Sequence, residues 1–274
     1  MRFDGVLLLS DLDGTFLNDE VAPVAANTEA VKRFINNGGL FSVASGRPPQ
    51  SALRYIGDCG VNFPAVLFNG AMAYDFEKEK PLFLLHPDRE TEKAVFGFYE
   101  EYKDRVGFIG YYEDKLVTAE RNRYSQIMEP FEALPFLEAP LSEMPFPAVK
   151  YLFIAEPETI NELYPKIKEA GRGRYRATSA GKYFVEILAK EADKGTTMRR
   201  ILEMKKGEVK TVVAVGDYLN DLCILEKADV KAVVKGAPKA LTDIADYVTK
   251  KTNNEGAVAD LIDNLEAILS AKAR

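Results

Sequence analysis

The sequence of 274 residues has few of the side chains that build disulfide frameworks, zinc sites and histidine-based catalytic centres. Its two cysteines, Cys59 and Cys223, lie far apart in the chain, and His86 is its single histidine. Two distant cysteines predict neither a disulfide framework nor a zinc site. One histidine argues against histidine-based catalysis and against a metal site with several histidines. We therefore interpret His86 as a surface or packing residue.

Long apolar runs and an excess of positive charge are also missing. No apolar run approaches the length that crosses a bilayer, and the start of the chain lacks the apolar stretch of a signal peptide. These features predict a cytoplasmic protein without a membrane partner. Lysine and arginine number 36 against 42 aspartates and glutamates, a formal net charge of −6. Nucleic acid is therefore not an expected partner, because binding the phosphate backbone needs a basic surface.

The chain has instead the composition of a folded protein that is large enough for two domains. Apolar residues make up 47% and charged residues 28%, as in soluble globular proteins. The first part alternates apolar runs with amphipathic segments, which predicts parallel strands joined by helices. The predicted elements there are strands at 6–10, 40–44 and 65–68, with helices at 27–37 and 50–59. Asn27 or Thr28 is the expected helix cap, and Gly38-Gly39 the expected end.

The pattern changes after Leu85 and returns after Ala192. Hairpins mixed with single helices predict an α+β unit in the middle of the chain. Its predicted elements are helices at 88–104 and 159–170, a hairpin of 106–112 with 115–119, and strands at 149–155, 175–178 and 183–188. The proline-rich stretch 130–147 is interpreted as a surface connection. The final part predicts helices at 194–204, 221–227, 238–245 and 256–271, with strands at 211–215, 231–234 and 247–249.

The simplest architecture is an α/β protein, with a Rossmann-like parallel-sheet core domain interrupted by an inserted α+β domain. The core domain is expected to combine residues 1–84 with residues 189–274, and the inserted domain to span residues 85–188. In such open sheets, ligands bind at the carboxyl ends of the strands. The residues that follow each predicted strand are therefore the first candidates for a functional site.

Two carboxylates, Asp11 and Asp13, come directly after the first buried strand. Positions i and i+2 of an extended chain point the same way, so both side chains can face one ligand, and Gly14 allows a sharp turn. Acids this close repel each other unless a cation lies between them or one is protonated. An ordinary polar turn remains the alternative, because Asp and Gly are common turn residues.

A second strand ends in the same way, with Asp217 after 211–215 and Asp221 four residues further on. At a helix start, these two acids would face the same side. Together with Asp11 and Asp13 they would supply hard oxygen ligands without any histidine or cysteine, which suits Mg²⁺. The alternative for this pair is a turn acid and an acid favoured by the helix dipole.

Two further sites are positive or rich in donors. Ser45-Gly46 follows the second strand and offers a hydroxyl and backbone N–H groups of the kind that hold a phosphate. Lys194 lies at the start of a predicted helix, where the dipole does not favour a cation. For Ser45-Gly46 the alternative is an ordinary turn at the end of a strand. For Lys194 the alternative is a solvated surface lysine. The functional alternative is a lysine that balances four acids and an incoming phosphate.

The order of these segments resembles the haloacid dehalogenase superfamily of phosphatases. The matching segments are Asp11-Leu12-Asp13-Gly14-Thr15, Ser45-Gly46-Arg47, Lys194 and Gly216-Asp217-Tyr218-Leu219-Asn220-Asp221. The long insert between the second and third segments resembles the cap domain of the Cof-type, class IIB subgroup. The stretch from Thr252 to Val258 is also similar to one common in that subgroup. The resemblance thus runs over nearly the whole chain.

The resemblance implies a role for each of these residues in phosphoester hydrolysis. Asp11 would be the nucleophile that forms an aspartyl-phosphate. Asp13 would protonate the leaving alcohol and then activate water. Lys194 would offset charge and orient Asp11. Ser45 and the amide of Gly46 would bind the phosphoryl group, and Asn220 would help to hold either the phosphate or Lys194.

The same resemblance implies a Mg²⁺ site and a class of substrate. Mg²⁺ would be held by Asp11, the backbone carbonyl of Asp13, Asp217 and Asp221, the last directly or through water. The expected partner is a small phosphorylated metabolite of the sugar-phosphate type, handled by a monomer or a homodimer. A sugar phosphomutase is the nearest alternative. A slow relative that senses a phosphorylated ligand is another, suggested by the unusual Tyr218-Leu219 and Lys235-Gly236-Ala237-Pro238 loops.

Overall fold

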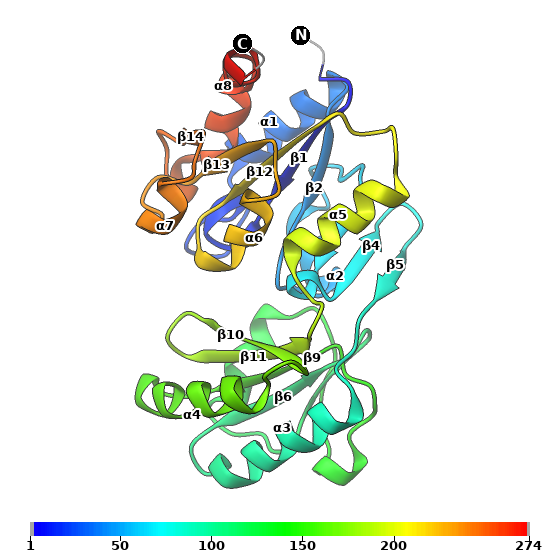
Figure 1. Cartoon of the computed structure of the whole chain (residues 1–274), viewed down its shortest axis with the longest axis vertical. Coiled ribbons are helices and arrows are strands. Elements are labelled where there is room, and N and C mark those ends of the chain that lie inside the picture. The colour runs from blue at the N-terminus through cyan, green and yellow to red at the C-terminus, as the bar shows by residue number, and fades with distance from the viewer. Residues whose placement is uncertain (1–2, 273–274) are drawn as a thin grey trace. The chain divides into compact units, whose positions relative to one another are not determined.

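The protein divides into two compact units, each with its own sheet and helices. The computed structural model describes residues 3–272. One unit combines Met1–Phe83 with Asp193–Arg274 and is called the core unit; the other, Leu84–Ala192, is called the inserted unit (Figure 1). Among the described residues, no helix is both long and apolar enough to span a membrane.

A five-stranded parallel sheet forms the centre of the core unit, so the predicted α/β class is confirmed. Its strand order is β14-β13-β12-β1-β2. The strands are β1 (Val6–Ser10), β2 (Leu40–Val43), β12 (Thr211–Gly216), β13 (Val230–Val233) and β14 (Tyr247–Val248). Strand β1 lies inside the sheet, between β12 and β2, and is buried on both faces, with Leu7, Leu8 and Leu9 at most 1% exposed. Burial on both faces explains why β1 is a continuous apolar run rather than an alternating one.

The prediction that the third strand joins this parallel sheet is wrong. Strand β3 (Ala65–Leu67) belongs to a separate sheet, β3-β4-β5, and pairs antiparallel with β4 (Met72–Asp75). Neither β4 nor β5 (Lys80–Leu84) was predicted. A single parallel bridge, between Ala44 and Val66, links β3 to the end of β2. An apolar run reports burial but not strand direction, and the turn after β3 reverses the chain into β4.

Within residues 3–272, six α-helices belong to the core unit, and the first of them begins earlier than predicted. The helices are α1 (Ala25–Asn36), α2 (Pro49–Ile56), α5 (Lys194–Met204), α6 (Leu222–Leu225), α7 (Lys239–Thr242) and α8 (Ala257–Lys272). Neither Asn27 nor Thr28 is the cap of α1, because Val24 occupies that position without a side-chain hydrogen bond. Asn27 lies inside the first turn of α1 and is completely buried.

Asn27 connects three separate segments of the core unit. Its amide Nδ2 donates to the Phe16 carbonyl at 2.9 Å, and its Oδ1 accepts from the Ala259 N–H at 2.9 Å. Phe16 ends the turn that follows Asp11, and Ala259 lies in the first turn of α8. The buried amide therefore satisfies two backbone groups that a helix cap would not reach.

Replacing Asn27 by Ala should destabilise the core unit without touching an ionisable group. The change leaves a buried carbonyl and a buried N–H without their partner, so we expect the free energy of unfolding to fall by about 1–3 kcal/mol. Urea unfolding followed by circular dichroism measures the loss. Asn36→Ala, at an exposed position of the same helix, is the matched control and should change stability little. Equal stability of the Asn27→Ala and Asn36→Ala proteins would contradict the stabilising role of the two Asn27 hydrogen bonds.

The inserted unit is a six-stranded sheet with the order β10-β11-β9-β6-β7-β8. Its elements are α3 (Arg89–Tyr102), β6 (Gly107–Tyr111), β7 (Leu116–Thr118), β8 (Phe136–Glu138), β9 (Lys150–Ile154), α4 (Pro157–Ala170), β10 (Tyr175–Ala180) and β11 (Phe184–Ala189). Residues of α3 and α4, such as Tyr99 and Leu163, pack with Phe108, Phe153 and Ile187 of the sheet. The predicted hairpin is confirmed as the antiparallel pair β6 and β7. The stretch 130–147 is more than a connection, because it contains β8, which pairs with β7.

Candidate active site

Three neighbouring strands of the core sheet deliver polar residues to one edge. Asp11 follows β1, Ser45 follows β2 after one residue, and Asp217 follows β12. The strand ladder continues to this edge, because the Asp11 N–H donates to the Val215 carbonyl at 2.9 Å and the Ala44 N–H to the Ser10 carbonyl at 2.9 Å. Since β1 lies between β2 and β12, the three parallel strands end side by side. The edge is where α/β sheets bind ligands.

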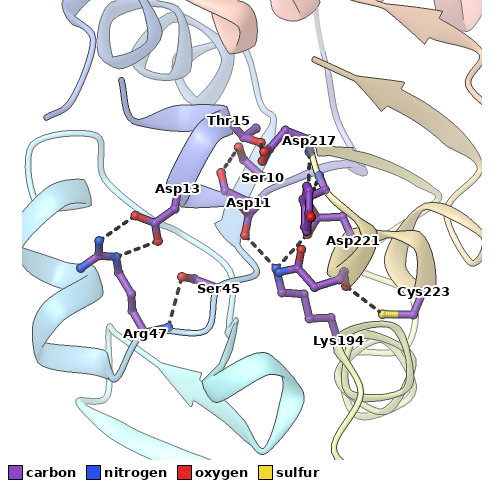
Figure 2. Close-up of polar contacts among 12 residues, drawn as sticks. Ser10, Asp11, Asp13, Thr15, Ser45, Arg47, Lys194, Asp217, Asp221 and Cys223 are labelled. Carbon is purple, nitrogen blue, oxygen red and sulfur yellow. Dashed lines mark hydrogen bonds and ion pairs between the residues drawn. The ribbon is translucent and has the colours of Figure 1, made fainter. Parts of the chain in front are cut away.

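Asp11, Asp217 and Asp221 come together as a compact acidic cluster. One carboxylate oxygen from each lies within 4.8 Å of the others, and Figure 2 shows Asp11 and Asp217 after two strand ends, with Asp221 from the next turn beside them. Burial and then the Asp221 carboxylate raise the pKa of Asp217 to about 6, although Thr15, which donates to Asp217 at 2.8 Å, acts to lower it. Burial first, and then Asp221, raises the pKa of Asp11 well above its usual range. The fold thus holds these acids close together against their repulsion.

Lys194 lies between two of these acids and is almost fully buried. Its ammonium donates to Asp11 Oδ1 at 2.7 Å and to Asp221 Oδ1 at 2.8 Å, and 1% of the residue is exposed (Figure 2). Burial alone would lower the pKa of this lysine, but the two carboxylates outweigh it and raise the pKa above its usual value. The ammonium therefore remains charged. These ion pairs explain a cation at a helix start, since Lys194 is the first residue of α5.

Asp221 is also oriented by the backbone. Its Oδ2 accepts from the N–H groups of Asp217 at 3.1 Å and Tyr218 at 3.3 Å. The sequence spacing suggested a helix start with both acids on one side. The structure instead places Asp221 at the end of a short 3₁₀ turn, Leu219–Asp221, which leads into α6. The two acids meet through this turn rather than across one helical turn.

The carboxylate of Asp13 lies apart from the acidic cluster. Both of its oxygens accept hydrogen bonds from Arg47, at 2.9 Å from Nε and 2.6 Å from a terminal nitrogen. The chain turns at Gly14, with φ of 79°, and the side chains of Asp11 and Asp13 face different partners (Figure 2). Arg47 stacks on the Tyr55 ring at 4.6 Å. The predicted metal contact of Asp13, through its backbone carbonyl, stays a prediction.

Arg47 and Thr15 are site residues to which the sequence reasoning gave no role. Both belong to the segments that resemble the superfamily. Their signal was their position beside Ser45 and Asp13 in segments that follow strands. Sequence alone does not show that the guanidinium of Arg47 turns toward Asp13, because the two residues lie on different loops.

The residues predicted to bind phosphate occupy the same edge of the core unit. Ser45 is buried, and its Oγ accepts from the Arg47 N–H at 3.2 Å. Gly46 is half-buried, whereas Asn220 is exposed and its carbonyl accepts from the Cys223 thiol at 3.4 Å. Tyr218 and Leu219, beside Asn220, are 44% and 52% exposed. The phosphate-binding roles of Ser45, Gly46 and Asn220 stay predictions.

The acidic cluster has the donor set of a site for a hard divalent cation. All three of its ligand atoms are carboxylate oxygens, and burial, followed by repulsion between the acids, raises the pKa of Asp11 and Asp217. A bound cation would relieve that repulsion, and Mg²⁺ and Ca²⁺ prefer such oxygen ligands. The residues present therefore fit a divalent metal.

Residues 8–262 match the haloacid dehalogenase-like hydrolase family, and the chain belongs to this family. It is 26% identical, over 93% of its length and 96% of the relative, to a 5-amino-6-(5-phospho-D-ribitylamino)uracil phosphatase of Bacillus subtilis. A glucosyl-3-phosphoglycerate/mannosyl-3-phosphoglycerate phosphatase of Persephonella marina is 22% identical, with 84% of each chain covered. A haloacid dehalogenase-like hydrolase of Bacteroides thetaiotaomicron has the same fold, with a TM-score of 0.85, 22% identity and coverage of 94% and 98%. The prediction of a phosphatase of this superfamily is confirmed at the level of the family.

Proposed function

We propose that the protein hydrolyses small sugar-phosphate-like monoesters, with Mg²⁺ as cofactor, through an aspartyl-phosphate intermediate. The observation that carries the proposal is the buried ammonium of Lys194 between Asp11 and Asp221, with Asp217 beside them. Phosphoryl transfer mainly requires that the reacting groups be positioned and their charge be offset. This cluster provides a fixed carboxylate next to a fixed positive charge.

In the first half of the reaction, Asp11 attacks phosphorus. A bond forms between a carboxylate oxygen and phosphorus while the bond from phosphorus to the ester oxygen breaks, and Asp13 gives that oxygen a proton. In the second half, water attacks phosphorus, Asp13 takes the proton from the water, and the bond from phosphorus to Asp11 breaks. Lys194 stays paired with Asp11 and offsets negative charge throughout.

The metal would be held by Asp11, the backbone carbonyl of Asp13, Asp217 and Asp221. When bound, Mg²⁺ offsets the charge of these carboxylates and of the phosphoryl oxygens. Ser45 and Gly46 would donate to the same oxygens, and Asn220 would assist them. Lys194 would then be the buried positive charge that the chain itself supplies next to Asp11.

Asp13 must change partners during this reaction. Both of its oxygens accept hydrogen bonds from Arg47, so neither oxygen is available to a leaving group while this pair is intact. The half-exposed side chain of Asp13 has room to move, since 49% of it is accessible. Proton transfer to the leaving oxygen therefore follows release of Asp13 from Arg47.

Phosphate release from a panel of esters tests the proposal. We expect turnover of p-nitrophenyl phosphate and of sugar phosphates that stops when EDTA removes the metal. The sugar-phosphate class is supported by the relatives, which are named for compounds with a ribityl or sugar group. Isomer formation without net phosphate release would instead indicate a phosphomutase. Tight binding of esters without turnover would indicate a slow relative that acts as a sensor.

Metal binding should stabilise the protein more at pH 7.5 than at pH 5. The pKa of Asp217 is about 6 in the folded protein against an ordinary value of 3.8. Because the folded state holds this proton more tightly, the associated stability is present at low pH and lost as the pH rises through about 6. Bound Mg²⁺ replaces the proton and restores stability above that pH.

Thermal unfolding with and without Mg²⁺ at the two pH values measures this difference. Asp217→Asn is the informative variant, because it removes the titrating group, and its Mg²⁺-induced shift in Tm should be small at both pH values. An equal shift at pH 5 and pH 7.5 in the wild-type protein would contradict the prediction.

A further inference from the structure

A strained turn follows β3 in the core unit. Phe68, Asn69 and Gly70 have consecutive positive φ values of 49°, 51° and 97°. Two of the three residues carry a Cβ, and Phe68 is completely buried. Left-handed backbone at such residues is costly and persists where the surrounding contacts enforce it, which is common at functional sites. The contacts of this turn therefore indicate what it holds in place.

On one side, the turn is joined to the loop that begins with Ser45. The Asn69 N–H donates to the Ser45 carbonyl at 3.0 Å, and the Phe68 N–H donates to the Arg47 carbonyl at 3.2 Å. The side chain of Asn69 packs on Gly46, because a Cβ built on Gly46 would lie 2.9 Å from Asn69 Nδ2. A carboxamide thus lies directly beside the backbone that is proposed to bind the phosphoryl group.

On the other side, the turn packs against the start of α5. The Gly70 carbonyl accepts from Thr197 Oγ1 at 2.6 Å. A Cβ on Gly70 would lie 2.3 Å from the Asp193 carbonyl carbon and 2.6 Å from the Lys194 nitrogen. The turn is therefore packed between the Ser45 loop and the helix start that carries Lys194. It sets the spacing between these two parts of the site.

We propose that Asn69 is a further phosphate-binding residue, whose side-chain amide donates to the phosphoryl group beside Ser45 and Gly46. The inference rests on the proposed function. Asn suits the position because it tolerates left-handed backbone better than most residues, and its two amide N–H donors allow one to serve the fold and one the ligand. The residue is half-buried rather than fully enclosed.

Asn69→Asp tests this role with little change of shape. Asp also tolerates left-handed backbone, and it replaces a donor by a negative charge. We expect the inhibition constants of inorganic phosphate and orthovanadate to rise about tenfold or more, and KM to rise more than kcat falls. The melting temperature should change little. Asn36→Asp adds the same charge at an exposed position of α1 and should leave all of these constants unchanged.

A second variant separates binding from strain. Asn69→Gly removes the amide and relieves the backbone strain, so the protein should be as stable as the wild type or more stable, yet bind phosphate more weakly. Unchanged phosphate and vanadate inhibition in both variants would overturn the proposal, even if stability changes.

Failure of the proposed role of Asn69 can be distinguished from failure of the proposed function. Phosphate binding is also measured by calorimetry, which needs no turnover. If the wild type binds phosphate but hydrolyses no ester, the proposed function fails, and weaker binding by Asn69→Asp still supports the role of Asn69. If hydrolysis proceeds and both variants bind phosphate as the wild type does, the role of Asn69 fails and the proposed function stands. A wild-type protein that neither binds phosphate nor hydrolyses any ester overturns both.

Discussion

Asp11→Asn is expected to lower phosphate release by about 10³-fold or more while leaving the protein folded. Asn keeps the shape of the side chain but removes the negative charge that attacks phosphorus. Groups that act as one unit in covalent catalysis typically cost this much when one of them is removed. Initial rates with p-nitrophenyl phosphate at saturating Mg²⁺ measure the loss.

The stability of the Asp11→Asn protein should not fall with its activity. Burial and Asp221 raise the pKa of Asp11, so its ionised form is disfavoured in the metal-free protein. A neutral amide removes one of the repelling charges, and we expect the metal-free melting temperature to be equal to or above that of the wild type. Lys194 keeps Asp221 as a partner.

The control for Asp11→Asn is Asp243→Asn, which makes the same change at an exposed acid paired with Lys239. It should alter neither turnover nor stability measurably. Turnover by Asp11→Asn within tenfold of the wild type would contradict the assignment of the nucleophile. A slow relative that acts as a sensor would behave differently. Both Asp11→Asn and Asp243→Asn would then bind the ester, and neither would hydrolyse it.

The acidic cluster and Lys194 could be predicted from sequence because the fold places them by simple rules. Strands β1 and β12 are buried on both faces, so each is a continuous apolar run whose end is easy to locate. Parallel neighbours end at the same edge, which brings Asp11 and Asp217 together. Helix α5 begins at the predicted residue because Asp193 caps it by accepting from the Thr196 N–H at 2.8 Å.

The partner of Asp13 and the turn after β3 could not be predicted in this way. Hydrophobic pattern reports which residues are buried, but not which side chain a loop carboxylate will face. The pairing of Asp13 with Arg47 depends on the chain turning at Gly14 and on the Tyr55 ring beneath the guanidinium. Asn69-Gly70 reads as an ordinary strand end.

The position of Asn27 illustrates the same limit. Asparagine near a helix start is a common cap, yet Asn27 lies inside the first turn of α1, and its side chain is buried between Phe16 and Ala259. Those two partners are 11 and 232 residues away in sequence. Local propensity favoured the cap, and tertiary contacts decided the outcome.

Lys194→Met is expected to be the most destabilising of the proposed changes and also to reduce turnover. Removing the ammonium leaves Asp11 and Asp221 as buried carboxylates without their partner. Breaking one side of a buried ion pair typically costs about 3–5 kcal/mol. Turnover should fall by about 10²–10³-fold, because the charge that stabilises the transferring phosphoryl group is lost. Chemical unfolding and steady-state rates, each with and without Mg²⁺, measure the two effects.

The double variant Lys194→Met/Asp221→Asn separates the two effects. Neutralising Asp221 removes one of the uncompensated charges, so stability should recover in part while turnover stays low. Lys227→Met is the matched control, since that partly exposed lysine pairs with Asp193 at 3.0 Å, and it should cost less than about 1 kcal/mol. A Lys194→Met protein that matches the Lys227→Met protein in stability and turnover would contradict the assignment, because the buried ammonium would then have no more effect than a surface ion pair.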